Sequence, residues 1–167
     1  MGIHVGIDFV EQHLTDLLAF VYEATQHGYG SENIAGDENT TDGSSKIPYE
    51  NGDWRFLDTY YGGEPYSGMS TVFYKGVSCW TMIYYGRVLP HVDDKQYVYD
   101  CLCPALLAAT KEYPFRGPAN FVADNGLIYE NYWDGNITSF CGSESITDSD
   151  GVKQFETCYA GGLVNLR

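Results

Sequence analysis

The chain is poor in basic residues. Nine Lys and Arg stand against twenty-three Asp and Glu among 167 residues, which gives a formal net charge of −14 at pH 7. A nucleic acid or an anionic membrane surface needs a basic protein face to contact its phosphates. The composition therefore argues against direct binding to either partner. Solubility is the simplest consequence of the acidity, and an acidic surface for a basic protein partner is the alternative.

The sequence also lacks the features of exported, membrane-spanning and metal-binding proteins. No apolar run is long enough to cross a bilayer, and no signal peptide is visible at the N-terminus. The five Cys show no C-x-x-C spacing, and the four His fall in no zinc pattern. We therefore expect a cytoplasmic protein with reduced cysteines and with no metal or cofactor.

Signatures of common catalytic classes are missing as well. The chain contains no G-x-S-x-G elbow and no phosphate-binding loop. Cys141, beside Gly142 in an expected turn, is the one cysteine kept as a candidate nucleophile. The sequence therefore leans towards a protein that is not an enzyme.

Aromatic residues are abundant, with fifteen Tyr, eight Phe and three Trp, and this composition favours strands. Residues 58–89 resemble residues 130–164. The matched residues include Asp58 with Glu130, Gly68 with Gly142, and Tyr84 with Tyr159. A repeat of this length predicts two similar β-rich units with a cleft between them.

Hydrophobic spacing predicts the individual elements. Helices are expected over residues 8–26, with Asp8 as the N-cap, and over 94–110, with a kink or restart at Pro104. A first short strand is expected over residues 3–7. The other expected strands cover residues 54–61, 70–74, 77–85, 127–133, 144–148, 152–160 and 162–166.

These elements predict a single domain over residues 1–167, made of two repeats at about 8–89 and 94–166. The predicted fold class is α+β, a duplicated helix plus three-stranded antiparallel meander with the helices packed on antiparallel sheet. The polar segment 29–46 is expected to be a mobile loop.

Three carboxylates are candidate catalytic groups: Asp58, Glu64 and Glu130. A carboxylate pair supports acid–base chemistry when burial separates the two pKa values. Asp58 and Glu64 flank a Gly-rich turn around which they could converge, and Asp58 and Glu130 could face each other across the seam between the repeats. The alternative is a turn whose Asp caps local N–H groups.

The aromatic residues are the better indication of a binding site, because the chain has more Tyr hydroxyls than a small core can satisfy with hydrogen bonds. The Arg residues of interest either bind an anionic ligand or pair with carboxylates, and pairing is favoured. The predicted ligand-binding residues are Tyr60, Trp80, Tyr84, Arg87, Arg116, Tyr132 and Trp133.

The predicted function is binding or sensing of a small ligand or peptide in an aromatic-lined cleft between the repeats. A hydrolase-like enzyme that uses paired carboxylates is one alternative. An acidic module that docks on a protein partner is the other, and its affinity would fall steeply with salt.

Several motifs carry a family resemblance. They are Asp58-x-Tyr60-x-Gly62-Gly63-Glu64, Tyr66-x-Gly68, Lys75-Gly76-Val77, Trp80-x-Met82-x-Tyr84-Tyr85-Gly86, Arg116-Gly117-Pro118 and Gly161-Gly162-Leu163. Over about residues 17–164 the chain resembles an uncharacterised, mainly bacterial family, domain of unknown function 5680. The resemblance implies a bacterial protein and brings no established activity. It also implies a departure at Ser70, where relatives often carry an acid. The second repeat of this chain keeps an acid, Glu144, at the equivalent position.

Overall fold

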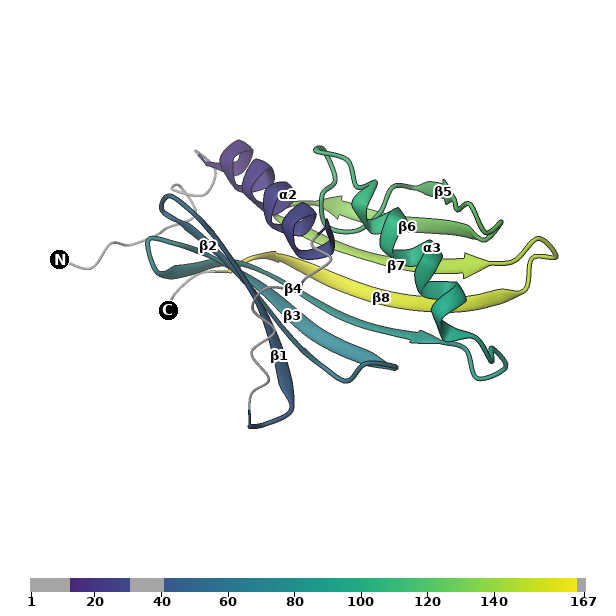
Figure 1. Ribbon diagram of the computed structural model, residues 1–167. Helices are drawn as coiled ribbons and strands as arrows, with labels where there is room; N and C mark the ends of the chain where they lie inside the picture. Colours follow the sequence, from purple (N-terminus) through teal and green to yellow (C-terminus); the bar gives the residue numbers. More distant parts are fainter. Residues whose placement is uncertain (1–12, 31–40, 165–167) are drawn as a thin grey trace.

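The structure is a computed structural model that describes residues 13–30 and 41–164. Within these ranges it contains two helices and eight strands (Figure 1). The helices are α2 (Leu14–Gly30) and α3 (Lys95–Leu107). The strands are β1 (Ser44–Asn51), β2 (Trp54–Tyr61), β3 (Tyr66–Tyr74), β4 (Val77–Val88), β5 (Asn120–Val122), β6 (Ile128–Asn136), β7 (Ser139–Thr147) and β8 (Lys153–Leu163).

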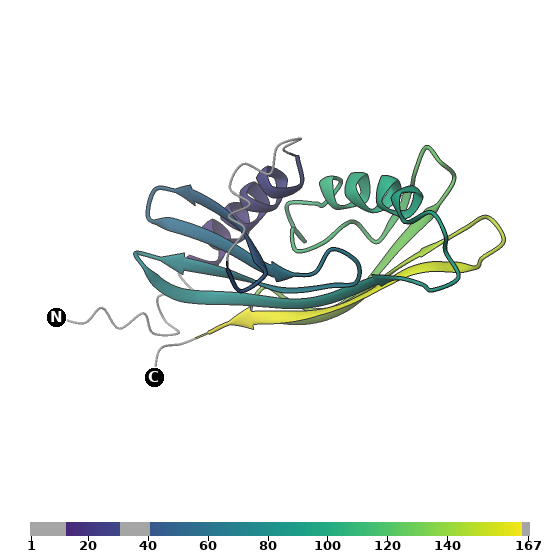
Figure 2. The same cartoon turned by 60° about the horizontal axis from the view of Figure 1, so that its bottom comes forward.

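All eight strands belong to one antiparallel sheet with the order β1-β2-β3-β4-β8-β7-β6-β5. Both helices lie on the same side of this sheet, which curves around them (Figure 2). We call this side the helix-covered face and the other side the outer face. None of the described helices combines the length and the apolar character that a bilayer crossing requires.

This architecture corrects the predicted fold class. The chain is mainly β, and it does not form a duplicated helix plus three-stranded meander. Four consecutive strands follow each helix, and β4 pairs with β8 so that one sheet runs through the whole molecule. The error arose because strand periodicity predicts which segments are extended but not which edges pair.

The sequence patterns missed β1 and β5, which form the two edges of the sheet. α2 ends and β1 begins inside the segment 29–46 that was predicted to be a mobile loop, so that prediction is wrong for residues 29–30 and 44–46. Pro48 interrupts the pattern of β1, and an edge strand tolerates a residue without an N–H. Residues 3–7, Asp8 and residues 31–40 lie outside the described residues.

Local sequence signals explain where several elements begin and end. The Asp94 side chain accepts a hydrogen bond from the Tyr97 amide at 3.1 Å, which caps α3 at its predicted start. Lys75 and Gly76 both have positive φ, 49° and 81°, and form the tight β3–β4 hairpin that the sequence predicts. Helix α3 continues through Pro104, without the restart that was expected there.

Two apolar clusters fill the space between the helices and the sheet. The cluster under α2 includes Leu17, Phe20, Val21, Val72, Trp80 and Phe140. The cluster under α3 includes Val98, Leu102, Leu106, Leu127, Ile146 and Phe155. The space between the two helices is where the sheet carries polar side chains instead.

Strand register decides which face each side chain occupies, and in β6 it differs by one residue from the sequence match. That match aligned Asp58 with Glu130, but the residue of β6 that corresponds to Asp58 in the sheet is Asn131. In β2, Tyr60 pairs with Gly68, and Asp58 lies two residues before Tyr60. In β6, Trp133 pairs with Gly142, and Asn131 lies two residues before Trp133. A shift of one residue moves a side chain to the opposite face. Glu130 therefore lies on the outer face, away from Asp58.

Candidate functional site

Three hollows stand out among the described residues. One of about 600 Å³ lies on the outer face, over β4, β6, β7 and β8. A second of about 570 Å³ lies between α2 and the β6–β7 turn. The third, of about 310 Å³, lies between the helix-covered face and both helices, and we call it the inner cavity. The first hollow has the largest volume of the three, but the residues that line a hollow determine whether it suits a ligand.

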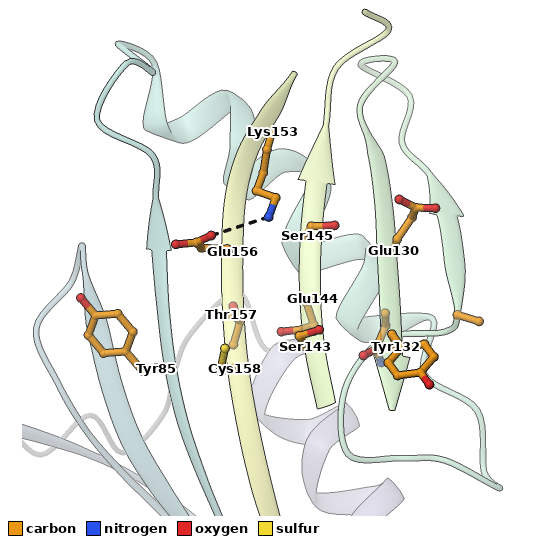
Figure 3. A pocket seen from close by; sticks show the side chains of 12 residues that line it. Tyr85, Glu130, Tyr132, Ser143, Glu144, Ser145, Lys153, Glu156, Thr157 and Cys158 are labelled. Atoms are coloured by element: carbon orange, nitrogen blue, oxygen red, sulfur yellow. Dashed lines mark ion pairs between the residues drawn. The ribbon is translucent and has the colours of Figure 1, made fainter. Parts of the chain in front are cut away.

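The outer hollow is formed by the exposed surface of the sheet (Figure 3). Tyr132 is 77% exposed at one side, and Lys153 forms an exposed ion pair with Glu156 at 3.7 Å. Solvated charges of this kind are screened and bind a ligand weakly. The outer hollow is therefore the weaker candidate, although it is larger.

The inner cavity takes its wall from both helices and from several strands. Helix α3 contributes one stripe with the spacing i, i+3, i+4 and i+7, which consists of Tyr99, Leu102, Cys103 and Leu106. The remaining lining residues are Gly28, Ile47, Asp58, Tyr60, Gly62, Gly63, Tyr66, Tyr84 and Arg116. Rings, a carboxyl group and a guanidinium group thus meet in one hollow, which is typical of a ligand site.

Asp58 is the carboxyl group of the inner cavity. The Tyr84 hydroxyl donates to its Oδ2 at 2.8 Å and lies 3.0 Å from its Oδ1, and the Ser70 hydroxyl donates to Oδ1 at 3.0 Å. Burial raises the pKa of Asp58, although these hydrogen bonds and the charge of Arg116 oppose the rise. A partly buried carboxyl group with a raised pKa in a cavity is a typical mark of a functional site.

The Tyr84 ring reaches Asp58 because it passes over Gly68. A Cβ atom at Gly68 would overlap the Tyr84 hydroxyl, so only glycine allows the ring to lie there. The position of Tyr84 is thus fixed by the backbone of the neighbouring strand, and the hydrogen bond to Asp58 follows from it.

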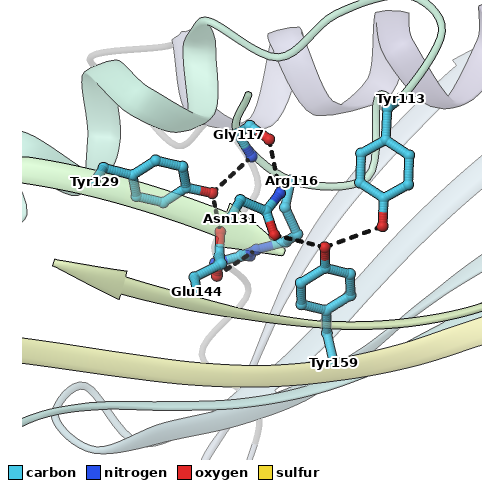
Figure 4. Close-up of polar contacts among 7 residues, drawn as sticks. All are labelled: Tyr113, Arg116, Gly117, Tyr129, Asn131, Glu144 and Tyr159. Carbon is cyan, nitrogen blue, oxygen red and sulfur yellow. Dashed lines mark hydrogen bonds and ion pairs between the residues drawn. The ribbon is translucent and has the colours of Figure 1, made fainter. Parts of the chain in front are cut away.

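Arg116 is a buried charge in the cavity wall, and Glu144 compensates it (Figure 4). The Arg116 Nη2 lies 2.7 Å from Glu144 Oε2, and its Nε donates to the same oxygen at 2.9 Å. Only 2% of the Arg116 side chain and none of the Glu144 side chain is exposed. The buried Tyr129 hydroxyl donates to the other carboxylate oxygen. Such a pair is stable only when its partners are held in place, because both charges are desolvated.

A further set of hydrogen bonds fixes the backbone next to Arg116 (Figure 4). The Asn131 amide donates to the Gly117 carbonyl at 2.8 Å, and the Gly117 amide donates to the Tyr129 hydroxyl at 3.0 Å. The Tyr159 hydroxyl donates to Asn131 at 2.7 Å, and burial raises the pKa of Tyr159 to about 12. The loop that carries Arg116 is therefore attached to β6 and β8 by neutral, fully buried groups.

The comparisons with known proteins identify a family. The family model described as a domain of unknown function, DUF5680, matches residues 58–164. The chain belongs to the DUF5680 family. No curated protein and no solved structure matches this DUF5680 protein significantly. The matched range includes the polar residues of the inner cavity, and it begins after α2 and β1, which supply Gly28 and Ile47.

Four of the residues predicted from the sequence line the inner cavity of this DUF5680 protein: Asp58, Tyr60, Tyr84 and Arg116. Glu64 lies next to it. Its carboxylate accepts hydrogen bonds from the Val88 amide at 2.7 Å and from the Tyr99 hydroxyl at 2.6 Å. Glu64 thus orients Tyr99, which itself faces the cavity.

The other predicted residues lie elsewhere. Trp80 is fully buried in the core and donates its indole N–H to the Ile137 carbonyl at 3.0 Å. Trp133 stacks on Tyr113 with 3.9 Å between ring centroids. Arg87 pairs with Glu156 at 2.7 Å, the kind of pairing that the sequence favoured. The residues that lie on the outer face are Glu130, Tyr132 and Cys141. Cys141 is part of β7, where a turn was expected.

Sequence reasoning did not propose Tyr66 or Tyr99 for the site. Tyr66 follows the Gly-rich turn directly, and Tyr99 belongs to the α3 stripe, so helical spacing could have found it. Within the described ranges, no group of three or more His, Cys, Asp and Glu side chains is arranged to hold a metal ion.

Proposed function

We propose that this DUF5680 protein binds a small molecule in the inner cavity. Asp58 carries the proposal, because it is a partly buried carboxyl group with a raised pKa that faces a cavity lined by four Tyr residues. The volume of about 310 Å³ is at the lower end of the range of small-molecule sites, about 300–1,000 Å³. This size favours a compact ligand over the peptide that the sequence left open.

A cavity-filling variant tests the proposal. Cys103 lines the cavity and Leu107 is 37% exposed on another side of α3. Cys103→Trp should fill the cavity, and Leu107→Trp is the matched control because it adds the same ring outside. The probes are benzylammonium, benzyl alcohol and benzoate, which have similar shapes and different charges.

Binding is measured by amide chemical shifts in NMR titrations. We expect at least one probe to shift resonances of Tyr60, Gly63 and Cys103, and we expect Cys103→Trp but not Leu107→Trp to abolish the shifts. If none of the three probes binds the wild-type protein, or if Cys103→Trp binds them unchanged, the proposal is wrong. Native mass spectrometry of the purified protein shows in parallel whether a ligand is already bound.

Acid–base catalysis by Asp58 is a second candidate, because its raised pKa suits a general acid. A partnership of Asp58 with Glu130 is not supported, since the two side chains lie on opposite faces of the sheet. The hydrolase alternative would therefore rest on Asp58 with Glu64 behind Tyr99. The acidic docking module also stays a prediction, and salt-independent binding to a basic partner would exclude it.

A further inference from the structure

The charges around the inner cavity do not balance, and this imbalance indicates a ligand class. Arg116 is compensated by Glu144, with both side chains buried. Asp58 has no cation of its own among the described residues and relies on hydroxyl donors from Tyr84 and Ser70. Glu64, behind Tyr99, adds another carboxylate. Because Glu144 compensates Arg116 from behind the cavity wall, the wall carries an excess of negative charge when Asp58 is ionised.

The direction of the hydrogen bonds also matters. The Tyr84 hydroxyl donates to Asp58, and the Tyr99 hydroxyl donates to Glu64. Each phenol therefore directs its proton to a carboxylate, so this proton is not available to an anionic ligand. A phenol that donates to an anion is richer in electrons than a free one. The region around such a phenol therefore attracts a hydrogen-bond donor or a cation rather than a hydrogen-bond acceptor.

The rings themselves form a surface that suits a cation. Tyr66 and Tyr84 meet edge to face, with centroids 6.0 Å apart and an interplanar angle of 61°, and Tyr60 and Tyr99 complete the wall. The negative face of such a ring attracts a cation that lies over it. Within the protein, Arg116 already uses the Tyr84 ring in this way, with Cζ 5.9 Å from its centroid.

Burial of Asp58 adds a thermodynamic reason. Its pKa is raised because desolvation of the carboxylate outweighs the hydrogen bonds from Tyr84 and Ser70 and the charge of Arg116. An ammonium group that donates to Asp58 would compensate this charge and lower the pKa again. A neutral ligand cannot compensate the charge of Asp58 and so lacks this contribution to its binding free energy.

We propose that the inner cavity selects small organic ammonium ions, with the charged nitrogen bound by Asp58 and the Tyr60, Tyr66 and Tyr99 rings around it. This inference rests on the proposed function, and it adds the ligand class. It predicts a preference for positive charge among ligands of one shape.

The three benzyl probes test this preference in the wild-type protein. At neutral pH benzylammonium should bind at least about tenfold more tightly than benzyl alcohol, the scale of one charge-assisted contact with ring faces. Benzoate should bind more weakly than both. Equal affinity for benzylammonium and benzyl alcohol would overturn the ammonium inference but leave the proposed function intact. Tighter binding of benzoate would also overturn it, because Arg116 would then direct recognition.

Two variants that each remove one negative charge identify the group that causes the preference for positively charged ligands. Asp58→Asn should weaken benzylammonium binding by about tenfold or more and leave benzyl alcohol nearly unchanged. Glu130→Gln is the control, since it removes the same charge from the outer face. If both variants weaken binding equally, the overall charge of the protein attracts the probe and the inference is wrong.

A pH titration of the wild-type protein keeps the inference testable if Asp58→Asn does not fold. Benzylammonium affinity should fall as pH is lowered through the raised pKa of Asp58, while benzyl alcohol affinity stays constant. The groups that face Asp58 are Tyr84 from β4, Tyr66 from β3, Tyr99 and Cys103 from α3, and the Arg116–Glu144 pair. Burial raises the pKa values of Tyr66, Tyr99 and Cys103, so these groups stay neutral in acid. Affinity that does not change with pH would contradict the role of Asp58.

Discussion

Replacing Glu144 by Ala leaves a buried guanidinium group without its carboxylate partner and should strongly destabilise the fold. The change removes the partner of Arg116 from a site with at most 2% exposure, and it removes an acceptor of the Tyr129 hydroxyl. Breaking a buried ion pair from one side costs about 3–5 kcal/mol, and an unsatisfied buried hydroxyl adds about 1–3 kcal/mol. Since these contributions overlap, we expect a loss of about 4 kcal/mol. That is a quarter or more of the roughly 5–15 kcal/mol of a typical domain.

Urea denaturation followed by tryptophan fluorescence measures this loss. Glu156→Ala is the matched control, because the Arg87–Glu156 pair has the same 2.7 Å separation between Nη2 and Oε1 but is exposed. Exposed pairs contribute little, so this control should change the midpoint only slightly. A loss of less than about 1 kcal/mol for Glu144→Ala, or equal losses for both variants, would refute the reasoning.

A double variant separates the charge from the packing. Arg116→Met combined with Glu144→Leu removes both charges and keeps most of the apolar volume. Replacing both members of a buried pair by apolar residues is often neutral or stabilising. We therefore expect the double variant to recover at least half of the stability that Glu144→Ala loses. A double variant that is less stable than Glu144→Ala would show that packing around these residues, and not the isolated charge, dominates.

Three further predictions concern the core and the cavity. Gly68→Ala should displace the Tyr84 ring, destabilise the protein by about 1–3 kcal/mol and abolish benzylammonium binding in the NMR titration. Because Asp58 has a raised pKa in the folded state, its ionisation destabilises the fold. Wild-type stability should therefore fall relative to Asp58→Asn as pH rises above the ordinary Asp value of 3.8, which denaturation at several pH values measures. Leu17→Ala, at a fully buried position, should cost about 2–5 kcal/mol in urea denaturation.

Local signals in the sequence predicted local structure well. Asp94 marked the start of α3, and the Lys75-Gly76 pair marked a hairpin, because a cap and a positive φ depend on residues next to each other. The strands β2, β4 and β8 could be found from their aromatic and β-branched residues. The edges could not, since β1 contains Pro48 and β5 has only three residues.

Only some residues of the candidate site could be found from the sequence. Asp58 and Tyr84 could be selected from residue type, and the structure brings them together. Glu130 was selected by an alignment that was wrong by one residue, and in a strand that error exchanges the two faces. Tyr99 lies far from Asp58 in the chain, and only the packing of α3 over the sheet brings them into one wall.

The cavity wall combines residues that lie far apart in the chain. Asp58 and Tyr84 belong to strands that precede α3, whereas Tyr99 and Arg116 come from α3 and the loop after it, so neither set makes the wall alone. In the chain, α3 and three strands separate β4 from β8. These two strands pair and so join the part of the sheet that precedes α3 to the part that follows it. Contacts of such long sequence separation form slowly. A ligand that binds only the completed cavity would stabilise the folded state by mass action and so oppose the separation of the two parts.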